Sequence, residues 1–143
     1  MIKYVTIRDL KNIKKKIKKK KIVLCHGVFD LLHGGHINYF KAARKFGDIL
    51  IVSLTDDKFV NKGPGRPAFS ISNRIKFLLE INCVDYVCVS SYDTAEKVIL
   101  NLKPNFYCKG GEYTLKKIKF DKNLKTELTA LKLTKGKFKT INQ

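Results

Sequence analysis

The sequence contains no tryptophan, one methionine and three histidines among its 143 residues, and it lacks any long apolar run. A membrane-spanning helix needs about 20 consecutive apolar residues, so this absence argues against a transmembrane protein. Positions 1–21 are rich in lysine and hold no apolar segment of the kind found in a secretory signal peptide. We therefore expect a chain without a membrane span, located in the cytoplasm.

The four cysteines form no CxxC pair and have no histidine at zinc-finger spacing. They are Cys25, Cys83, Cys88 and Cys108, and each lies in or beside a short apolar stretch. This pattern argues against a zinc site. It favours small, buried, reduced side chains in a reducing compartment.

Acidic residues are few, because 12 Asp and Glu stand against 30 Lys and Arg and leave a net charge of +18. The excess lies at the two ends: residues 1–21 hold ten basic residues against one acidic, and 109–143 hold ten against three. The middle, 22–108, holds ten against eight. Basic ends can attract nucleic acid or an anionic membrane. No aromatic residue interrupts the lysines of 14–21, so we interpret the ends as a solvated surface and do not expect a nucleic-acid partner.

Apolar stretches and turn signals alternate regularly along the chain. Short apolar runs predict strands at 22–25, 49–54, 84–89, 106–108 and 138–141. Helical spacing of apolar residues predicts helices over 7–20, 35–45, 71–81, 93–102 and 124–131. Strands that alternate with helices in this way predict one α/β domain, a doubly wound, Rossmann-like parallel sheet with helices on both faces. The expected organisation is a basic amphipathic helix within 1–21, followed by the domain over 22–143.

Two helix starts carry capping signals. Ser70 precedes the helix over 71–81 and is expected to cap it. Asp93, with Glu96 three residues later, resembles a capping box and is expected to open the next helix. The polar segment 55–69 contains glycines and prolines and predicts a loop that is long for a compact domain, as functional loops often are.

The turn after the first long strand carries the residues most suggestive of chemistry. It reads HGVFDLLHGGH from His26 to His36 and leads into a predicted helix. His33 and His36 lie at the start of that helix, where unpaired N–H groups and the helix dipole attract phosphate. Their imidazoles can donate hydrogen bonds to oxygens that gain charge during phosphoryl transfer. For His26, packing and ligand contact both remain open.

These residues resemble a known family. A strand, then GxFDxxHxGH, then a helix is the pattern of the cytidylyltransferase-like nucleotidyltransferases of the HIGH superfamily, and every fixed element is present. Further matches are Gly47-Asp48, Thr55-Asp56-Asp57, Lys62-Gly63-Pro64-Gly65-Arg66-Pro67, Arg74 and Lys109-Gly110-Gly111-Glu112-Tyr113. The last set is most similar to the D-glycero-β-D-manno-heptose 1-phosphate adenylyltransferase domains of ADP-heptose synthesis, and to related domains fused to a ribokinase-type sugar kinase. The resemblance covers about residues 5–115.

The resemblance implies a role for each matching residue. His33 and His36 would hold the triphosphate and stabilise charge in the transition state, and Lys62 would close over the β- and γ-phosphates. The other nucleotide-binding residues would be Gly27, Val28, Phe29, Asp30, Gly35, Arg74, Lys109, Gly110 and Gly111. Asp30 would also lie near Mg²⁺, and Asp57 would face the acceptor. Two alternatives stay open: Lys62 and Arg66 could be part of a solvated loop, and Asp56 could be a turn cap.

The implied reaction is nucleotidyl transfer. An acceptor phosphate oxygen would attack the α-phosphorus of ATP, so that AMP passes to a sugar 1-phosphate such as the heptose phosphate and pyrophosphate leaves. The related alternatives are CTP-dependent transfer to glycerol 3-phosphate and FAD-synthetase-type adenylyl transfer. The implied partners are ATP or CTP, Mg²⁺, a sugar or polyol phosphate, a fused or separate sugar kinase, and a second copy in a homodimer.

One feature departs from the family. Its members usually end with a Ser/Thr-rich turn that opens a final helix and grips phosphate, and no such stretch precedes Gln143. We expect either that the chain is truncated or that another segment substitutes for this turn. The corresponding alternative function is an inactive nucleotide-binding module of a larger kinase fusion.

Overall fold

A parallel β-sheet forms the centre of the chain. The structure is a computed structural model that describes residues 3–17, 19–60, 63–110 and 120–142. The six strands are β1 (Lys3–Val5), β2 (Ile22–Gly27), β3 (Ile49–Thr55), β4 (Tyr86–Ser90), β5 (Phe106–Gly110) and β6 (Lys137–Ile141). Their order across the sheet is β1-β4-β3-β2-β5-β6, and every neighbouring pair is parallel.

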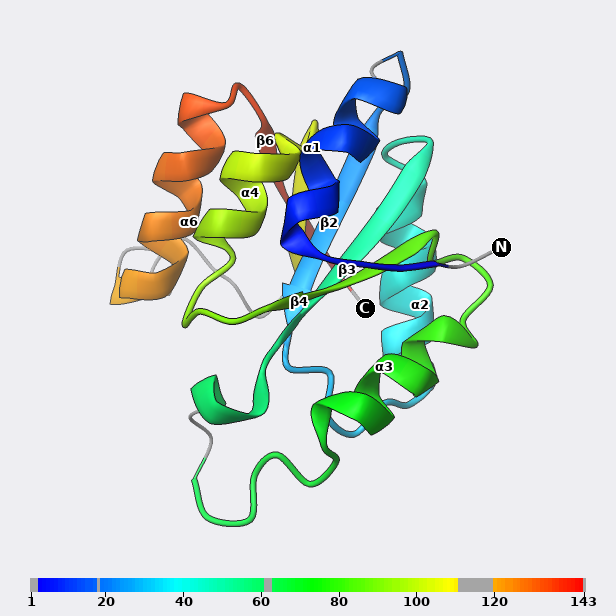
Figure 1. The fold of residues 1–143 in the computed structure, drawn as a ribbon, viewed down its shortest axis with the longest axis vertical. Coiled ribbons are helices and arrows are strands. Elements are labelled where there is room, and N and C mark those ends of the chain that lie inside the picture. Colours follow the sequence, from blue (N-terminus) through cyan, green and yellow to red (C-terminus); the bar gives the residue numbers. More distant parts are fainter. Residues whose placement is uncertain (1–2, 18, 61–62, 111–119, 143) are drawn as a thin grey trace.

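Helices cover both faces of this sheet (Figure 1). They are α1 (Ile7–Lys16), α2 (Gly34–Arg44), α3 (Ile71–Leu79), α4 (Glu96–Leu102) and α6 (Lys122–Leu133), with a short 3₁₀ helix η1 (Asp57–Phe59) after β3. The helices α1, α4 and α6 pack on one face, and α2 and α3 pack on the other. The doubly wound α/β fold predicted from the sequence is therefore confirmed.

The alternation of side chains along each strand builds two apolar cores. In β2, Ile22 and Leu24 point to the face covered by α1, α4 and α6, whereas Val23 and Cys25 point to the face covered by α2 and α3. All four side chains are fully buried, and each large apolar one stabilises the fold by roughly 1.5–3 kcal/mol. A strand buried on both faces is typical of the middle of a parallel sheet, and β2 lies there.

The structure differs from the predicted elements at the N-terminal end. Residues Lys3–Val5 form β1, an edge strand paired with β4 that the sequence did not predict, because three residues are too few to show an alternating pattern. The first helix ends at Lys16 rather than near residue 20, since Ile17 has left the helical conformation at φ −119°. Helix α1 packs against α4 through Leu10 and Ile13.

The two predicted caps have opposite outcomes. Ser70 caps α3 by accepting a hydrogen bond from the N–H of Asn73, as predicted. The predicted cap at Asp93 is wrong, because α4 begins after Ala95 and Asp93 is exposed. The N–H of Ala95 instead donates to Glu127 of α6, at 2.8 Å, and the N–H of Glu96 donates to the hydroxyl of Thr94, at 3.1 Å, so one distant and one local acceptor serve the start of α4.

The cysteines are reduced and lie where the sequence predicted. Cys25, Cys88 and Cys108 are buried, and Cys83 is partly buried. Burial raises the pKa of the Cys88 and Cys108 thiols to about 12, so these thiols are inert at neutral pH. Across the described ranges, no helix combines the length and the hydropathy required to span a bilayer.

Candidate active site

The carboxyl ends of β2, β3 and β5 meet where the strand order reverses. From β2 the chain proceeds to β3 on one side and later returns to β5 on the other. In open parallel sheets, ligands bind in the crevice at such a reversal. A pocket of about 210 Å³ opens here, and its described lining is His26, Gly27, Val28, Thr55, Asp93, Lys109, Asp121, Asn123, Leu124 and Glu127.

The turn that leaves β2 is tightly folded. Phe29 has a left-handed backbone conformation, with φ at 47°, which brings its ring back over the strand end. A side chain at position 27 would place its Cβ 3.1 Å from that ring, so glycine suits this close approach. The same ring packs edge-on against Phe40 of α2 and against His36, with centroids 5.1 and 6.0 Å apart. This packing fixes the start of α2 against the strand.

His33 and His36 cap α2 reciprocally. The N–H of Gly35 donates to Nδ1 of His33 at 3.0 Å, and the N–H of His33 donates to Nδ1 of His36 at 3.3 Å. A ring nitrogen that accepts a hydrogen bond carries no proton, so each neutral imidazole has its proton on Nε2. The backbone therefore sets the tautomer in which Nε2 can donate to an anion, at a helix end that attracts anions.

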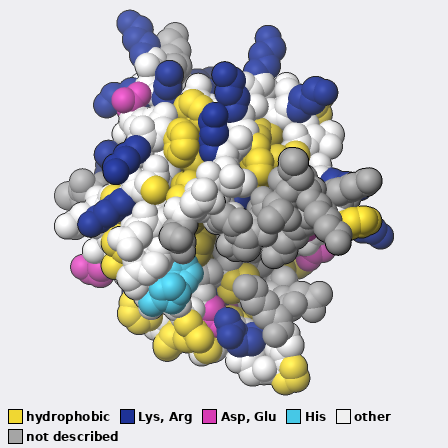
Figure 2. Space-filling view, turned by 180° about the vertical axis from the view of Figure 1, so that it is seen from behind, with side chains coloured by type: hydrophobic (Ala, Val, Ile, Leu, Met, Phe, Trp, Pro, Cys, Tyr) yellow, Lys and Arg dark blue, Asp and Glu magenta, His cyan; other side chains and the backbone are white. Residues whose placement is uncertain are grey.

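The two imidazoles form one surface feature. His33 is exposed and His36 is half-buried, and their ring centroids are 4.3 Å apart. In Figure 2 the exposed imidazoles form a single patch, apart from the Lys and Arg side chains spread over the upper part of that face. Both histidines lie outside the described lining of the pocket. The turn from Gly27 to His33 connects the pocket to this patch.

Asp30 fastens the long loop to this turn. Its side chain is only 2% exposed, and its oxygens accept hydrogen bonds from the N–H groups of Ala68, at 2.6 Å, and Phe69, at 2.8 Å. Nε of Arg66 lies 3.0 Å from Oδ2. Although burial alone would raise the pKa of Asp30, these backbone donors and the nearby arginines lower it below its ordinary value. Asp30 is thus a buried, ionised anchor.

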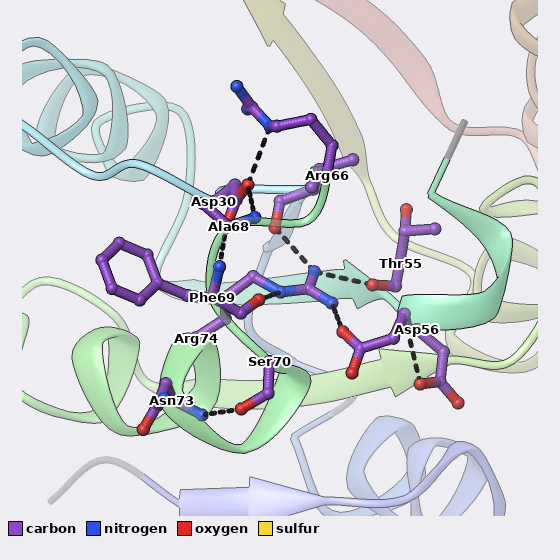
Figure 3. Close-up of polar contacts among 11 residues, drawn as sticks. Asp30, Thr55, Asp56, Arg66, Ala68, Phe69, Ser70, Asn73 and Arg74 are labelled. Carbon is purple, nitrogen blue, oxygen red and sulfur yellow. Dashed lines mark hydrogen bonds and ion pairs between the residues drawn. The ribbon is translucent and has the colours of Figure 1, made fainter. Parts of the chain in front are cut away.

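Arg74 lies at the centre of the same network (Figure 3). It is fully buried, and Nε donates to the carbonyl of Phe69 at 3.1 Å. Nη1 donates to the carbonyls of Val28 and Thr55, at 2.9 and 2.7 Å. Nη2 pairs with Oδ1 of Asp57. Arg74 therefore ties the ends of β2 and β3 to the loop before α3.

The two neighbouring aspartates have different positions. Asp56 accepts a hydrogen bond from the N–H of Asp57 and caps η1, which is the turn-cap alternative left open by the sequence. Asp57 pairs with Arg74, and its side chain is 40% exposed. The structure thus brings Asp57 together with Arg74 and Val28 rather than into the described lining of the pocket.

Lys109 and His26 join β5 to β2 at the pocket. Nζ of Lys109 donates to the carbonyl oxygen of His26 at 2.8 Å, which places the ammonium group at the reversal of strand order. The His26 ring is buried, with Nδ1 2.7 Å from the hydroxyl of Ser53. Burial, and then the charge of Lys109, lower the pKa of His26 well below its ordinary value, so its ring is neutral. His26 packs between the strands, and it lines the pocket, where contact with a ligand stays a prediction.

The remaining predicted residues have mixed outcomes. Gly35 lies in the first turn of α2, and its N–H donates to the imidazole of His33, the N-cap residue. Gly110 ends β5 beside β6, where it pairs in register with Ile141. Lys62 and Gly111 fall outside the described residues, so their predicted roles remain predictions.

The structure adds residues that the sequence reasoning missed. Glu127 is buried beside the pocket, where its carboxylate accepts hydrogen bonds from the N–H of Ala95 and the hydroxyl of Tyr107, both at 2.8 Å. A signal was present, because Glu127 lies on the apolar face of its helix, between Leu124 and Leu131. Asp121 caps α6 through the N–H of Leu124, so the start of α6 borders the pocket.

A metal centre made by protein side chains is not found in the described part of the chain, where no three His, Cys, Asp or Glu residues converge. What converges instead is a helix N-terminus with two imidazole donors, a lysine at a strand end and a network of arginines. Such a site suits a phosphorylated ligand. Fold and site together define the class: a doubly wound α/β domain with a candidate site for a phosphorylated ligand at the carboxyl ends of its strands.

The particular family follows from comparison with known proteins. The model of the cytidylyltransferase-like family matches residues 24–143, and the chain belongs to that family. The bifunctional protein HldE of Trichlorobacter lovleyi is 43% identical over 99 residues, which cover 68% of this chain and 20% of the relative. The bifunctional protein HldE of Helicobacter hepaticus is 41% identical over 118 residues, or 81% of this chain and 24% of the relative.

Solved structures agree on the fold. The lipopolysaccharide core biosynthesis protein from Thermoplasma volcanium is 27% identical with a TM-score of 0.67, and the match covers 86% of this chain and 95% of that one. The pantoate-beta-alanine ligase from Francisella tularensis, at 18% identity and a TM-score of 0.61, shares the fold over 99% of this chain and 67% of its own. The chain spans about a fifth to a quarter of the length of the curated relatives.

Proposed function

We propose that the chain transfers AMP from ATP to a sugar 1-phosphate, most specifically D-glycero-β-D-manno-heptose 1-phosphate, and releases pyrophosphate. The reciprocal capping of His33 and His36 at the N-terminus of α2 supports this proposal most directly, because it aims two Nε2–H donors where a triphosphate would lie. The names of the bifunctional relatives and of the Thermoplasma volcanium protein, and the resemblance to heptose phosphate adenylyltransferase domains, support the choice of acceptor.

The mechanism needs positioning and charge neutralisation rather than a general base. The acceptor phosphate is already an anion, so its oxygen can attack the α-phosphorus in line without losing a proton. The triphosphate would extend along the turn from Gly27 to His33, with the nucleoside toward the pocket that Lys109 borders. His33 and His36 would donate to oxygens that gain charge as pyrophosphate leaves.

Mg²⁺ is part of this proposal as the counter-ion of the triphosphate. The resemblance implies that Asp30 lies near Mg²⁺, but Asp30 does not suit direct coordination, because its oxygens already accept backbone N–H groups and pair with Arg66. Asp93, which lines the pocket and is exposed, is a carboxylate open to such an ion. Because Mg²⁺ often binds through one or two carboxylates together with substrate phosphates, we propose that it enters with the nucleotide.

A matrix of substrates tests the reaction. Pyrophosphate release is measured with ATP or CTP, each with Mg²⁺, against heptose 1-phosphate, glycerol 3-phosphate and FMN. The proposal expects turnover with ATP and the heptose phosphate above all other pairs. Turnover only with CTP and glycerol 3-phosphate, or only with ATP and FMN, would replace it by the corresponding alternative.

A second candidate is an inactive nucleotide-binding module of a larger kinase fusion. The observation that favours it is the small share of each bifunctional relative that the chain covers. Nucleotide affinity without turnover for any substrate pair would establish it, and robust turnover would exclude it. We also propose that the chain acts with a fused or separate sugar kinase and that it forms a homodimer. Sedimentation of the purified chain tests the homodimer.

The cytoplasm remains the expected compartment. All four cysteines are free and three are buried, as is usual for proteins of reducing compartments. Fractionation of cells that express the full gene product tests this expectation.

A further inference from the structure

A bound triphosphate needs cationic partners, and the described cations at this edge of the sheet are not equivalent. Lys109 lies at the end of β5, Arg74 in the first turns of α3 and Arg66 in the loop before α3, and each contacts the end of β2 or the turn that follows it. The family resemblance points to Arg74 as the arginine that would help position the phosphates. The contacts of the two arginines favour a different assignment.

Arg74 is fully engaged by the protein. Its guanidinium donates to three backbone carbonyls and to Asp57, and its residue surface is fully buried. A phosphate could bind Arg74 only by displacing these acceptors, and each buried carbonyl left without a donor costs about 1–3 kcal/mol. Arg74 therefore positions the loops, and its charge is already used within the fold.

Arg66 has the opposite character. Its Nε lies 3.0 Å from Oδ2 of Asp30, and its side chain is 34% exposed. Among the described residues, Asp30 is the one partner of this guanidinium. An arginine fork has five N–H donors, so most of them stay available on the far side of the group. Figure 3 shows the outer end of the Arg66 side chain pointing away from the network of Asp30 and Arg74.

The anchor of Arg66 is built to keep this arrangement. Asp30 is buried and ionised, since the factors that lower its pKa outweigh the effect of burial. The N–H groups of Ala68 and Phe69 bind the same carboxylate, so the backbone next to Arg66 is fastened as well. Asp30 precedes His33 by three residues, which places the held arginine beside the turn that opens α2.

We propose that Arg66 is a phosphate-binding residue of the nucleotidyl transfer, with Asp30 gripping Nε and the outer N–H groups binding oxygens of the triphosphate. This inference rests on the proposed function and adds a substrate contact to it. A guanidinium held through Nε presents two parallel N–H groups, the geometry that matches two phosphate oxygens. Arg74 then acts as a positioning residue behind it.

The test compares Arg66→Gln with a matched control, Arg44→Gln. Arg44 also pairs with an aspartate, through Nε at 3.2 Å from Asp85, and its side chain is 41% exposed, but it lies at the end of α2 on the opposite edge of the sheet. Calorimetry measures the binding of ATP, of inorganic pyrophosphate and of adenosine to the full chain. We expect Arg66→Gln to weaken ATP and pyrophosphate binding about 10- to 100-fold and to leave adenosine binding unchanged.

Two further readings separate phosphate contact from a purely structural role. Arg44→Gln should bind all three ligands as the wild type does. Arg66→Lys, which keeps the charge but loses the fork, should fall between the wild type and Arg66→Gln for ATP. Equal losses for adenosine and ATP in Arg66→Gln would mean a structural role, and unchanged ATP affinity would mean no contact; either result overturns the inference alone. A wild-type chain that binds neither ATP nor CTP would overturn the proposed function and this inference together.

Discussion

Two Arg–Asp pairs lie at opposite ends of the strands of one sheet. They show that the same kind of contact can have two different roles. At the amino-terminal ends of the strands, Asp85 accepts a hydrogen bond from the N–H of Leu50 and pairs with Arg44. At the carboxyl-terminal ends of the strands, Asp30 accepts hydrogen bonds from backbone N–H groups and pairs with Arg66. The exposed fraction of the carboxylate side chain is 27% for Asp85 and 2% for Asp30. A pair in solvent adds little to stability, whereas a buried anchor can hold an arginine in one place for a ligand.

The comparison extends to Arg74, the arginine with no exposed surface. It joins the ends of β2 and β3 and the loop before α3 through four acceptors, whereas Arg44 and Arg66 each pair with one aspartate. The carboxyl-terminal side of the sheet thus contains Arg74, whose contacts are all within the fold, and Arg66, whose side chain faces outward. The largest effects of substitution should follow this division.

The largest loss of stability is expected for Arg74→Met. The variant removes the arginine donor from three carbonyls, of which that of Thr55 is buried and the other two are partly buried, and it leaves Asp57 without its arginine partner, so the free energy of unfolding should fall by about 3–5 kcal/mol. Urea denaturation followed by circular dichroism measures this loss. A loss below about 1 kcal/mol, the range of exposed pairs, would show that Arg74 is not the internal tie described above.

His33→Ala should have the next largest effect, mainly on function. Loss of one donor to a developing charge costs about 100- to 1000-fold in turnover, while loss of the helix cap costs about 0.5–2 kcal/mol in stability. His33→Asn is the control, because its amide oxygen can accept the N–H of Gly35 but it has no Nε2–H. Stability regained without turnover supports the donor role, and turnover regained with the cap would contradict it.

Asp30→Asn should have an intermediate effect that depends on pH. An asparagine oxygen cannot accept both backbone donors as the carboxylate does, so the free energy of unfolding should fall by about 1–3 kcal/mol at neutral pH. Because the pKa of Asp30 is lowered in the folded chain, its ionised form stabilises the fold above the unfolded pKa, about 3.9. This contribution is lost as pH falls through the lowered folded pKa.

Denaturation curves recorded from neutral pH into the acid range check this behaviour. The difference between wild type and Asp30→Asn should shrink as the pH falls. A difference that stays constant with pH would show that the charge of Asp30 does not stabilise the fold.

The smallest effect is expected for Arg44→Gln. Its pair with Asp85 is partly exposed, so the free energy of unfolding should change by no more than about 1 kcal/mol. Thermal denaturation with and without ATP measures both stability and ligand binding. A loss of nucleotide-induced stabilisation in this variant would contradict the different roles given to the Arg44–Asp85 and Arg66–Asp30 pairs.

The features predicted from sequence are those carried by neighbouring residues. The buried strands appear as apolar runs, and His33 and His36 are three residues apart at a strand-to-helix turn. Contacts across long separations have no such signature. Asp30 lies 38 residues from Ala68, and Glu127 lies 32 residues from Ala95, whose N–H it accepts. The predicted cap at Asp93 was wrong, because Glu127 and the hydroxyl of Thr94 accept the N–H groups at the start of α4.

Burial of a charged side chain is also invisible locally. Arg74 stands among polar and apolar neighbours in a helix whose apolar spacing was predicted well, and nothing near it shows that three carbonyls surround it. Arg66, left open as a residue of a solvated loop, has a buried partner in the turn after β2. In both cases, the fold decides which arginine is enclosed and which is presented.

The pairing of β2 with β5 has a consequence for the order in which the chain matures. β2 and β3 are made early, but the other edge of β2 pairs with Phe106–Cys108, and Lys109 reaches back 83 residues to His26. During synthesis, the apolar strand β2 is therefore without its β5 partner until residues 106–108 have been made. An unpaired strand edge of this kind is an aggregation hazard. The proposed nucleotide site can assemble only when the last third of the chain has emerged, so a nascent chain is expected not to bind nucleotide before that stage.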